Sequence, residues 1–186
     1  MRAGAGAAPV IGIAGWKKSG KTTLAERLIA EFTRRGLRVA SIKHAHHDFQ
    51  IDDAATDSAR HRRAGAGQVA IVSGTRWAVV TELRGAPEPA LEEVAARLGP
   101  CDLVIVEGYK SAAIPKIEVR RTDAAGRRPL ADADPSVIAV AADHAADGAG
   151  RPVLALDDVE AIADFVAAAL ALPERARRAA DASTKP

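Results

Sequence analysis

The stretch GWKKSGKT, residues Gly15–Thr22, decides the fold of this 186-residue chain. It matches the pattern G-x-x-x-x-G-K-[S/T], whose glycines let successive backbone N–H groups curl around a phosphate. The apolar run VIGIAG, residues 10–15, comes first and predicts a short buried strand. Residues 22–35 follow with apolar side chains at helical spacing, and Gly36 predicts the end of that helix. The order strand, loop, helix therefore predicts a phosphate-binding loop.

The composition of this loop predicts a triphosphate and a magnesium ion as its ligands. Gly15 and Gly20 allow the backbone to close, and the helix behind them adds its positive dipole end. We expect Lys21 to bridge the β- and γ-phosphates and the Thr22 hydroxyl to complete a Mg²⁺ site. The alternative is a tight glycine turn without a ligand, against which the flanking strand and helix argue.

Beyond the loop, strand and helix patterns alternate over most of the chain. Such alternation predicts an α/β fold, a three-layer sandwich with a mostly parallel sheet flanked by helices, whose ligands lie beyond the carboxyl ends of the strands. Further strands are predicted at residues 37–44, 68–73, 76–83, 103–108, 115–121, 137–143 and 152–156, and further helices at 58–66, 89–99 and 157–172.

Length and composition predict one soluble domain. We expect a flexible N-terminus over residues 1–9, a single nucleotide-binding domain over 10–172 and a charged, disordered tail over 173–186. A net charge of +2 is too small to indicate nucleic acid or a membrane surface as the main partner. The single cysteine, Cys101, excludes an intramolecular disulfide and fits a reducing compartment, so we expect a cytoplasmic protein.

Two acidic residues follow predicted strands that should flank the loop. Glu107 ends the apolar run LVIVEG, where it could hold the metal directly or through water, or could be an ordinary solvated carboxylate. Asp143 ends VIAVAAD, where it could accept the N1–H and amine of guanine and so discriminate against adenine. Alternatively, Asp143 caps the next turn. The Asn-Lys-x-Asp signature of many guanine-binding proteins is excluded, because the chain has no asparagine.

A histidine cluster and two basic sets could serve a second ligand. In KHAHHD, residues 43–48, an extended backbone would put His44, His46 and Asp48 on one face. Three alternatives remain for this segment: a transition-metal site, contact with the nucleotide or another bound ligand, in which Asp48 reaches the Mg²⁺, and a polar loop. The basic sets could bind phosphate or an acidic partner, or could be solvated. They are Arg60, His61, Arg62 and Arg63, and Lys110, Lys116, Arg120 and Arg121.

Several segments taken in order resemble one known family. These segments are GWKKSGKTTL, IKHAHHDF, DSARHRRAGA, SGTRWAVVTE, LVIVEGYK, IPKIEV and VIAVAAD, within residues 10–166. Together they resemble the MobB type of molybdopterin-guanine dinucleotide biosynthesis protein. The phosphate loop is shared by many families, whereas the lysine-histidine stretch and VEGYK in this order are specific to this one.

The resemblance implies a P-loop NTPase-like, GTP-binding homodimer with bound Mg²⁺. Such a protein works beside the guanylyltransferase that joins GMP to molybdopterin, could itself contact molybdopterin, and hydrolyses GTP slowly at most. For hydrolysis, Lys21 would act on the phosphates, and Asp48 and Glu107 are the candidates for orienting water. By resemblance, the nucleotide residues are Gly15, Trp16, Lys17, Lys18, Ser19, Gly20, Lys21, Thr22, Thr23 and Asp143, and the metal-side residues are Thr22, Glu107 and Asp48.

Two other functions use the same loop. A small-molecule kinase would need an arginine-bearing lid, for which residues 58–66 could serve, but no acceptor pocket is evident in the sequence. A nickel-delivery GTPase would be favoured by a longer histidine tract and a cysteine pair, neither of which the chain has.

Overall fold

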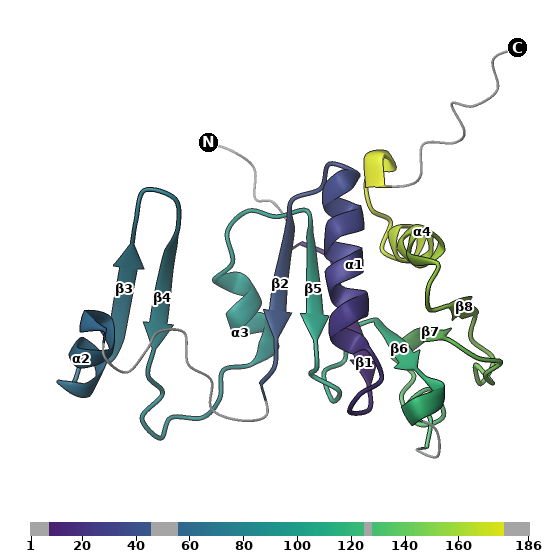
Figure 1. Cartoon of the computed structure of the whole chain (residues 1–186), viewed down its shortest axis with the longest axis horizontal. Coiled ribbons are helices and arrows are strands. Elements are labelled where there is room, and N and C mark those ends of the chain that lie inside the picture. The colour runs from purple at the N-terminus through teal and green to yellow at the C-terminus, as the bar shows by residue number, and fades with distance from the viewer. Residues whose placement is uncertain (1–7, 46–55, 125–127, 177–186) are drawn as a thin grey trace, which may run out of the picture. The chain divides into compact units, whose positions relative to one another are not determined.

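The computed structural model describes residues 8–45, 56–124 and 128–176. By its contacts the chain divides into two compact units, Met1–His44 with Leu91–Pro186, and Ala45–Ala90. We call them the sheet unit and the hairpin unit and describe each by itself (Figure 1). The prediction of a single domain over 10–172 stays a prediction. Within the described residues, no helix is long and apolar enough to cross a bilayer.

The sheet unit is built on a parallel sheet. In its described part six strands lie in the order β2-β5-β1-β6-β7-β8, and all five strand pairs are parallel. Hence β1, which feeds the phosphate loop, lies in the middle, between β5 and β6. The bounds are β1 Val10–Gly15, β2 Val39–Lys43, β5 Leu103–Glu107, β6 Lys116–Arg120, β7 Val137–Ala142 and β8 Val153–Ala155.

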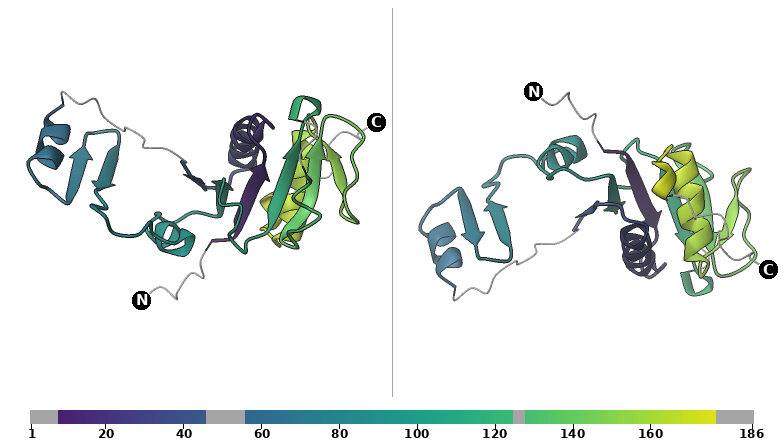
Figure 2. Two further views of the ribbon diagram at one scale, coloured as in Figure 1. Left: turned by 90° about the horizontal axis from the view of Figure 1, so that it is seen from below. Right: turned by 90° about the horizontal axis from the view of Figure 1, so that it is seen from above.

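Helices cover both faces of this sheet, so the predicted three-layer α/β sandwich of P-loop NTPase type is confirmed. Helices α1 (Lys21–Arg34) and α4 (Val159–Ala169) lie side by side (Figure 1) and share one core with alternate residues of the strands, such as Ile105. Helix α3 (Leu91–Ala96) packs on the opposite face, against Val104 and its neighbours (Figure 2). Both faces are apolar because the strands of a parallel sheet are buried on both sides.

Helix α1 connects the core to the phosphate loop. Leu24, Leu28 and Phe32 recur every four residues and are almost fully buried, so they fix the helix on the sheet. The helix ends as predicted at Gly36, which has φ +81° and donates its amide to the Thr33 carbonyl. At its other end α1 begins directly from the loop, so the buried stripe also fixes where the loop lies.

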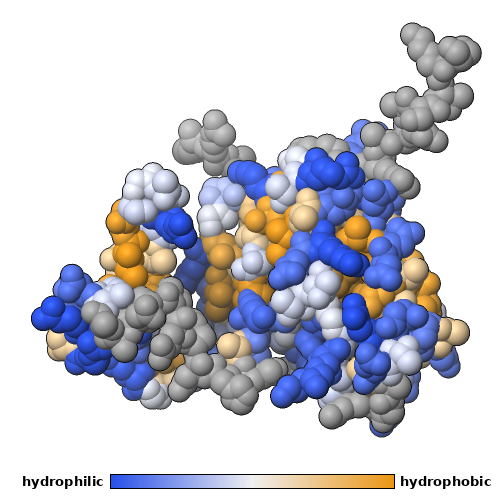
Figure 3. All heavy atoms as spheres, in the orientation of Figure 1, coloured by the Kyte–Doolittle hydropathy of each residue, from blue (hydrophilic) through white to orange (hydrophobic). Residues whose placement is uncertain are grey.

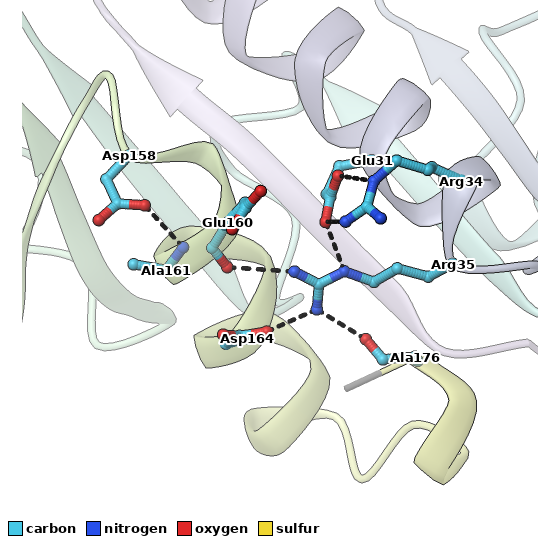
Figure 4. Close-up of polar contacts among 8 residues, drawn as sticks. All are labelled: Glu31, Arg34, Arg35, Asp158, Glu160, Ala161, Asp164 and Ala176. Carbon is cyan, nitrogen blue, oxygen red and sulfur yellow. Dashed lines mark hydrogen bonds and ion pairs between the residues drawn. The ribbon is translucent and has the colours of Figure 1, made fainter. Parts of the chain in front are cut away.

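The far end of α1 is held to α4 by a partly buried ion cluster (Figure 4). Glu31 accepts hydrogen bonds from Arg34 and Arg35 at 2.7–2.8 Å. Arg35, whose side chain is 3% exposed, also donates to Asp164 of α4 at 2.6 Å and to the Ala176 carbonyl. Bonds from Arg34 and then Arg35 lower the pKa of Glu31 to about 2, although burial acts in the opposite direction.

This cluster predicts an acid-sensitive fold. Moving the pKa of Glu31 from 4.5 to about 2 corresponds to about 3 kcal/mol of folding free energy. Because the folded-state pKa is the lower one, this contribution is present above pH 4.5 and is lost as the pH falls toward 2. Chemical denaturation of Glu31→Gln should show a weaker pH dependence over that window, whereas Glu26→Gln, an exposed change on the same helix, should match the unaltered chain. Equal pH profiles for both variants would contradict the assignment.

The hairpin unit contains α2 (Asp57–Arg63) and an antiparallel pair, β3 (Gln68–Val72) and β4 (Trp77–Thr81). Helix α2 begins at Thr56, whose side chain accepts the Ala59 amide. The sequence predicted all three elements, but not that the two strands form a sheet of their own.

Hydrophobic side chains on the hairpin are exposed. Figure 3 shows them gathered along the two strands. Val72 and Trp77 are 75% and 72% exposed, and Ile71, Val79 and Leu83 are exposed as well. Trp77 is therefore not a core residue of the described chain.

Candidate functional site

The phosphate loop turns sharply between β1 and α1. Gly15 and Gly20 have φ of +151° and +91°, and Lys18 has +65°, so three loop residues lie in or near a region that glycine adopts most easily. A Cβ at Gly15 would stand 2.6 Å from Ser19 Oγ and 2.7 Å from the Val119 carbonyl oxygen. The Ser19 side chain and the backbone of β6 thus leave room only for glycine at position 15, as the motif predicted.

Hydrogen-bond donors of the loop are available to an anion. The Ser19 side chain is buried, and its hydroxyl has no hydrogen-bond partner among the described residues. At the N-terminus of α1, Gly20 provides no side-chain cap for the first turn. An orphaned buried hydroxyl and uncapped amides at a positive helix end are what a bound phosphate would satisfy.

Lys21 lies over the loop, where its ammonium donates to the Trp16 carbonyl at 2.8 Å. Burial lowers the pKa of Lys21, and the positive charges of Lys110 and Lys43 lower it further, while Glu107 acts in the opposite direction. Lys110 itself lies over the Trp16 ring, 4.2 Å from its centroid. This gathering of cations favours a multiply charged anion, which would relieve their mutual repulsion.

Thr22 and Glu107 meet beside the loop. The Thr22 hydroxyl donates to Glu107 Oε1 at 2.7 Å, and Lys43 Nζ is 3.4 Å from Glu107 Oε2. Glu107 reaches this position because it ends β5, in register with Ile13 of β1. The structure therefore joins the two residues predicted for the metal side, although they are 85 positions apart.

The donors present here fit Mg²⁺. A hydroxyl and a carboxylate supply oxygen ligands, and Mg²⁺ commonly takes only one or two from protein while phosphate and water supply the rest. No cluster of three or more His, Cys, Asp or Glu suited to a metal occurs within the described residues. The other predicted metal-side residue, Asp48, lies outside them, as do His46 and His47.

Asp143 directly follows β7, on the other side of the loop, beyond β6. Its Oδ1 accepts hydrogen bonds from His144 Nδ1 at 2.8 Å, from the Thr122 amide at 2.9 Å and from the Thr122 hydroxyl at 3.2 Å. The bonds from His144 and then Thr122 lower the pKa of Asp143, so it is ionised at neutral pH. All three bonds fall on Oδ1 and hold the carboxylate in place.

A pocket of about 330 Å³ opens beside Asp143. Its other walls come from the ends of β7 and β8 and from the turn into α4, where Asp157 pairs with Arg27 of α1 at 3.1 Å. The lining is a mixture of apolar and polar groups at the carboxyl edge of the sheet, where ligands of open α/β sheets bind. The lining residues are Ala142, Asp143, His144, Val153, Leu154, Ala155, Leu156 and Asp157.

Of two residues near the loop, Thr122 was not singled out from the sequence, and Arg121 was named only as one member of a basic set. Thr122 orients Asp143, and Arg121 lies against Gly20, where an added Cβ would be 2.8 Å from Arg121 Nε. The basic set that includes Arg121 separates in the structure. Lys116 is buried, paired with Asp134 at 2.8 Å, and Arg120 pairs with Glu118 at 2.7 Å. A solvated role for Lys116 is thus wrong, because its side chain is buried at the start of β6 and paired with the Asp134 carboxylate.

The described part of the histidine cluster lies near the metal side. His44 follows β2 and donates its amide to the Glu107 carbonyl. Its ring lies 4.6 Å from that of Tyr109, tilted by 37°. In the other basic set, Arg62 pairs with Glu82 at 3.1 Å and Arg60 with Asp57 at 3.3 Å, so these two charges are partly neutralised.

Comparison with known proteins gives one consistent answer. The family model of molybdopterin guanine dinucleotide synthesis protein B matches residues 10–143. Molybdopterin-guanine dinucleotide biosynthesis adapter proteins of Escherichia coli and Haemophilus influenzae are 42% and 40% identical over 161 residues. The alignments cover 85% of this chain and 91% and 87% of those proteins.

Solved structures agree with the sequence matches. A crystal structure of molybdopterin-guanine biosynthesis protein B superposes with a TM-score of 0.67 at 30% identity, over 87% of this chain and 99% of that one. Bacillus subtilis MobB gives 0.63 at 26% identity, over 87% and 97%. The resemblance expected from the sequence is confirmed: the chain belongs to the MobB family of molybdopterin-guanine dinucleotide synthesis proteins.

Proposed function

We propose that this chain binds GTP with Mg²⁺ and serves as an adapter in molybdopterin-guanine dinucleotide biosynthesis, assisting the guanylyltransferase that attaches GMP to molybdopterin. The observation that carries the proposal is the bond between Thr22 and Glu107 at the head of an uncapped phosphate-loop helix. The names of the relatives, which are adapter proteins of this pathway, support the choice over a kinase or a nickel GTPase.

In this proposal the loop holds the phosphates. The amides of the first turn of α1 and the Ser19 hydroxyl face the anion, and Lys21 leaves the Trp16 carbonyl for the β- and γ-phosphates. Thr22 and Glu107 would hold Mg²⁺, which would neutralise charge on the two terminal phosphates. Glu107 is also placed to orient a water for slow hydrolysis, the role for which Asp48 is the other candidate.

The pocket beside Asp143 would hold guanine. Its volume of about 330 Å³ accommodates a purine, and Asp143 is ionised with Oδ1 already fixed. Oδ2 then accepts from the guanine N1–H or amine, donors that adenine lacks on that edge. Since the pocket and Glu107 lie on opposite sides of the loop, the nucleotide would run from the base at β7 to Mg²⁺ at β5.

The adapter role is tested by reconstitution. Binding of GTP and ATP is first measured with Mg²⁺, and GTP-loaded chain is then added to the guanylyltransferase with molybdopterin and Mg·GTP. The proposal predicts a preference for GTP and faster formation of the dinucleotide than with the transferase alone. The same rate with and without the chain would contradict the adapter role. Adding molybdopterin without the transferase tests whether it contacts this chain directly.

The exposed hairpin supports the proposal of a homodimer. A two-stranded hairpin is only marginally stable by itself. On β3 and β4 about three quarters of the Val72 and Trp77 surface is exposed, and exposed apolar side chains are a feature of interaction surfaces. Sedimentation equilibrium should give twice the chain mass, and Trp77→Glu should shift the equilibrium toward monomer. A monomeric unaltered chain at high concentration would contradict the proposal.

A further inference from the structure

Arg121 lies against the phosphate loop although it follows a different strand. It comes directly after β6, the neighbour of β1 on the side away from Glu107. A Cβ added to Gly20 would be 2.8 Å from Arg121 Nε, 3.4 Å from Cζ and 3.5 Å from Nη2. The guanidinium therefore packs against Gly20, the N-cap residue of α1.

The Arg121 guanidinium has an unmet need for an acceptor. Its Nε is buried and has no hydrogen-bond partner among the described residues. Lys116 nearby is paired with Asp134, and Arg120 is paired with Glu118 through Nη2, although Arg120 Nε also has no hydrogen-bond partner among the described residues. A buried N–H without an acceptor is costly, so an anionic ligand at Gly20 would complete the site.

The order of the strands indicates which phosphate Arg121 would meet. On one side of β1 lie β5 and the pair Thr22 and Glu107, where Mg²⁺ and the terminal phosphates are expected. On the other side lie β6 and β7, with the base pocket at Asp143. Arg121 stands on the base side, so the α-phosphate is the nearest part of a nucleotide that runs between the two.

The next residue strengthens this placement. Thr122 holds Asp143 Oδ1 through both its amide and its hydroxyl. Two adjacent residues at the end of β6 therefore contact the phosphate loop and the base-side aspartate.

We propose that Arg121 binds the α-phosphate of the guanine nucleotide. The inference rests on the proposed GTP binding and extends it to a residue outside the loop. A guanidinium forms paired, charge-assisted bonds with phosphate oxygens. Because the α-phosphate is common to GTP, GDP and GMP, the contact would strengthen all three equally and would not distinguish the hydrolysed from the intact nucleotide.

Competition binding with labelled GTP tests the inference. Arg121→Ala is expected to weaken GTP, GDP and GMP by the same factor, about 10- to 100-fold, as for loss of a charge-assisted contact. Guanosine, which has no phosphate, should compete equally against both proteins. Arg121→Lys should recover part of the loss, and Arg97→Ala, which removes an exposed arginine at the end of α3, should leave all four affinities unchanged.

Distinct outcomes would overturn the inference. Unchanged nucleotide affinities in Arg121→Ala would show that Arg121 does not contact the α-phosphate. A loss of affinity for GTP alone would show that Arg121 contacts the γ-phosphate instead. If Arg121→Ala lost as much affinity for guanosine as for GMP, Arg121 would only shape the pocket and would not bind phosphate. If Arg121→Ala unfolds, as monitored by circular dichroism, Arg121→Met and the lysine variant replace it. Failure of the unaltered chain to bind GTP would instead refute the proposed function.

Discussion

Lys21→Ala is expected to weaken GTP binding by about a hundredfold or more while the chain still folds. The Lys21 ammonium now rests on the Trp16 carbonyl at 2.8 Å, within reach of the loop that would hold the β- and γ-phosphates. Charge-assisted bonds contribute about 1.5–3 kcal/mol each, so loss of two costs about 3 kcal/mol or more. The fold should survive, because Leu24, Leu28 and Phe32 anchor the helix independently.

Titration calorimetry with Mg·GTP measures this loss, and thermal unfolding without nucleotide checks the fold. Removing the charge also ends the repulsion from Lys110 and Lys43 that lowers the pKa of Lys21, so the nucleotide-free protein should not be less stable. Arg97→Ala is the control for loss of one exposed positive charge from the same unit. Unchanged GTP affinity in Lys21→Ala, with its fold intact, would contradict the assignment of the loop.

Asp143→Asn should remove most of the preference for GTP over ATP. Oδ1 of Asp143 is held by Thr122 and His144, and in the proposed complex Oδ2 accepts from guanine. An amide that turns its NH₂ toward the base faces the guanine amine, donor against donor, and loses the charge as well. Sites that depend on such donors discriminate by large factors, so the preference should fall by about a hundredfold.

A xanthine nucleotide makes the Asp143 experiment sharper. Xanthine has a carbonyl where guanine has its amine. This carbonyl oxygen is repelled by a carboxylate but accepts a hydrogen bond from an asparagine NH₂. Asp143→Asn should therefore bind XTP more tightly than GTP, the reverse of the unaltered chain. Asp132→Asn, an exposed change in the loop before β7, should keep the original order. If Asp143→Asn still prefers GTP over ATP and XTP, the guanine contact lies elsewhere.

The sequence predicted the sheet unit well because its patterns are local. VIGIAG and LVIVE are continuous apolar runs, and the buried stripe of α1 repeats every four residues, so each element forms by short-range rules. The hairpin could also have been found, since only four residues, SGTR at 73–76, separate its strands. Such a spacing is typical of an antiparallel turn.

The arrangement around the loop could not be predicted from local patterns. Glu107 was expected there because a strand-end acid is a recognisable signal, and its contact with Thr22 agrees with that expectation. Arg121 reaches Gly20 only because β6 lies beside β1, a matter of strand order that periodicity does not encode. Likewise, Lys116 is buried because Asp134, 18 residues away, supplies its counter-charge.

The central claim is that the phosphate loop, with Thr22 and Glu107 beside it, binds GTP through a magnesium ion. Calorimetric titration of the unaltered chain with GTP, in Mg²⁺ and again in excess EDTA, tests this most directly. We expect one GTP to bind per chain with Mg²⁺, and GTP to bind with markedly weaker affinity in EDTA. No heat of binding with Mg·GTP, confirmed by equilibrium dialysis, would contradict it.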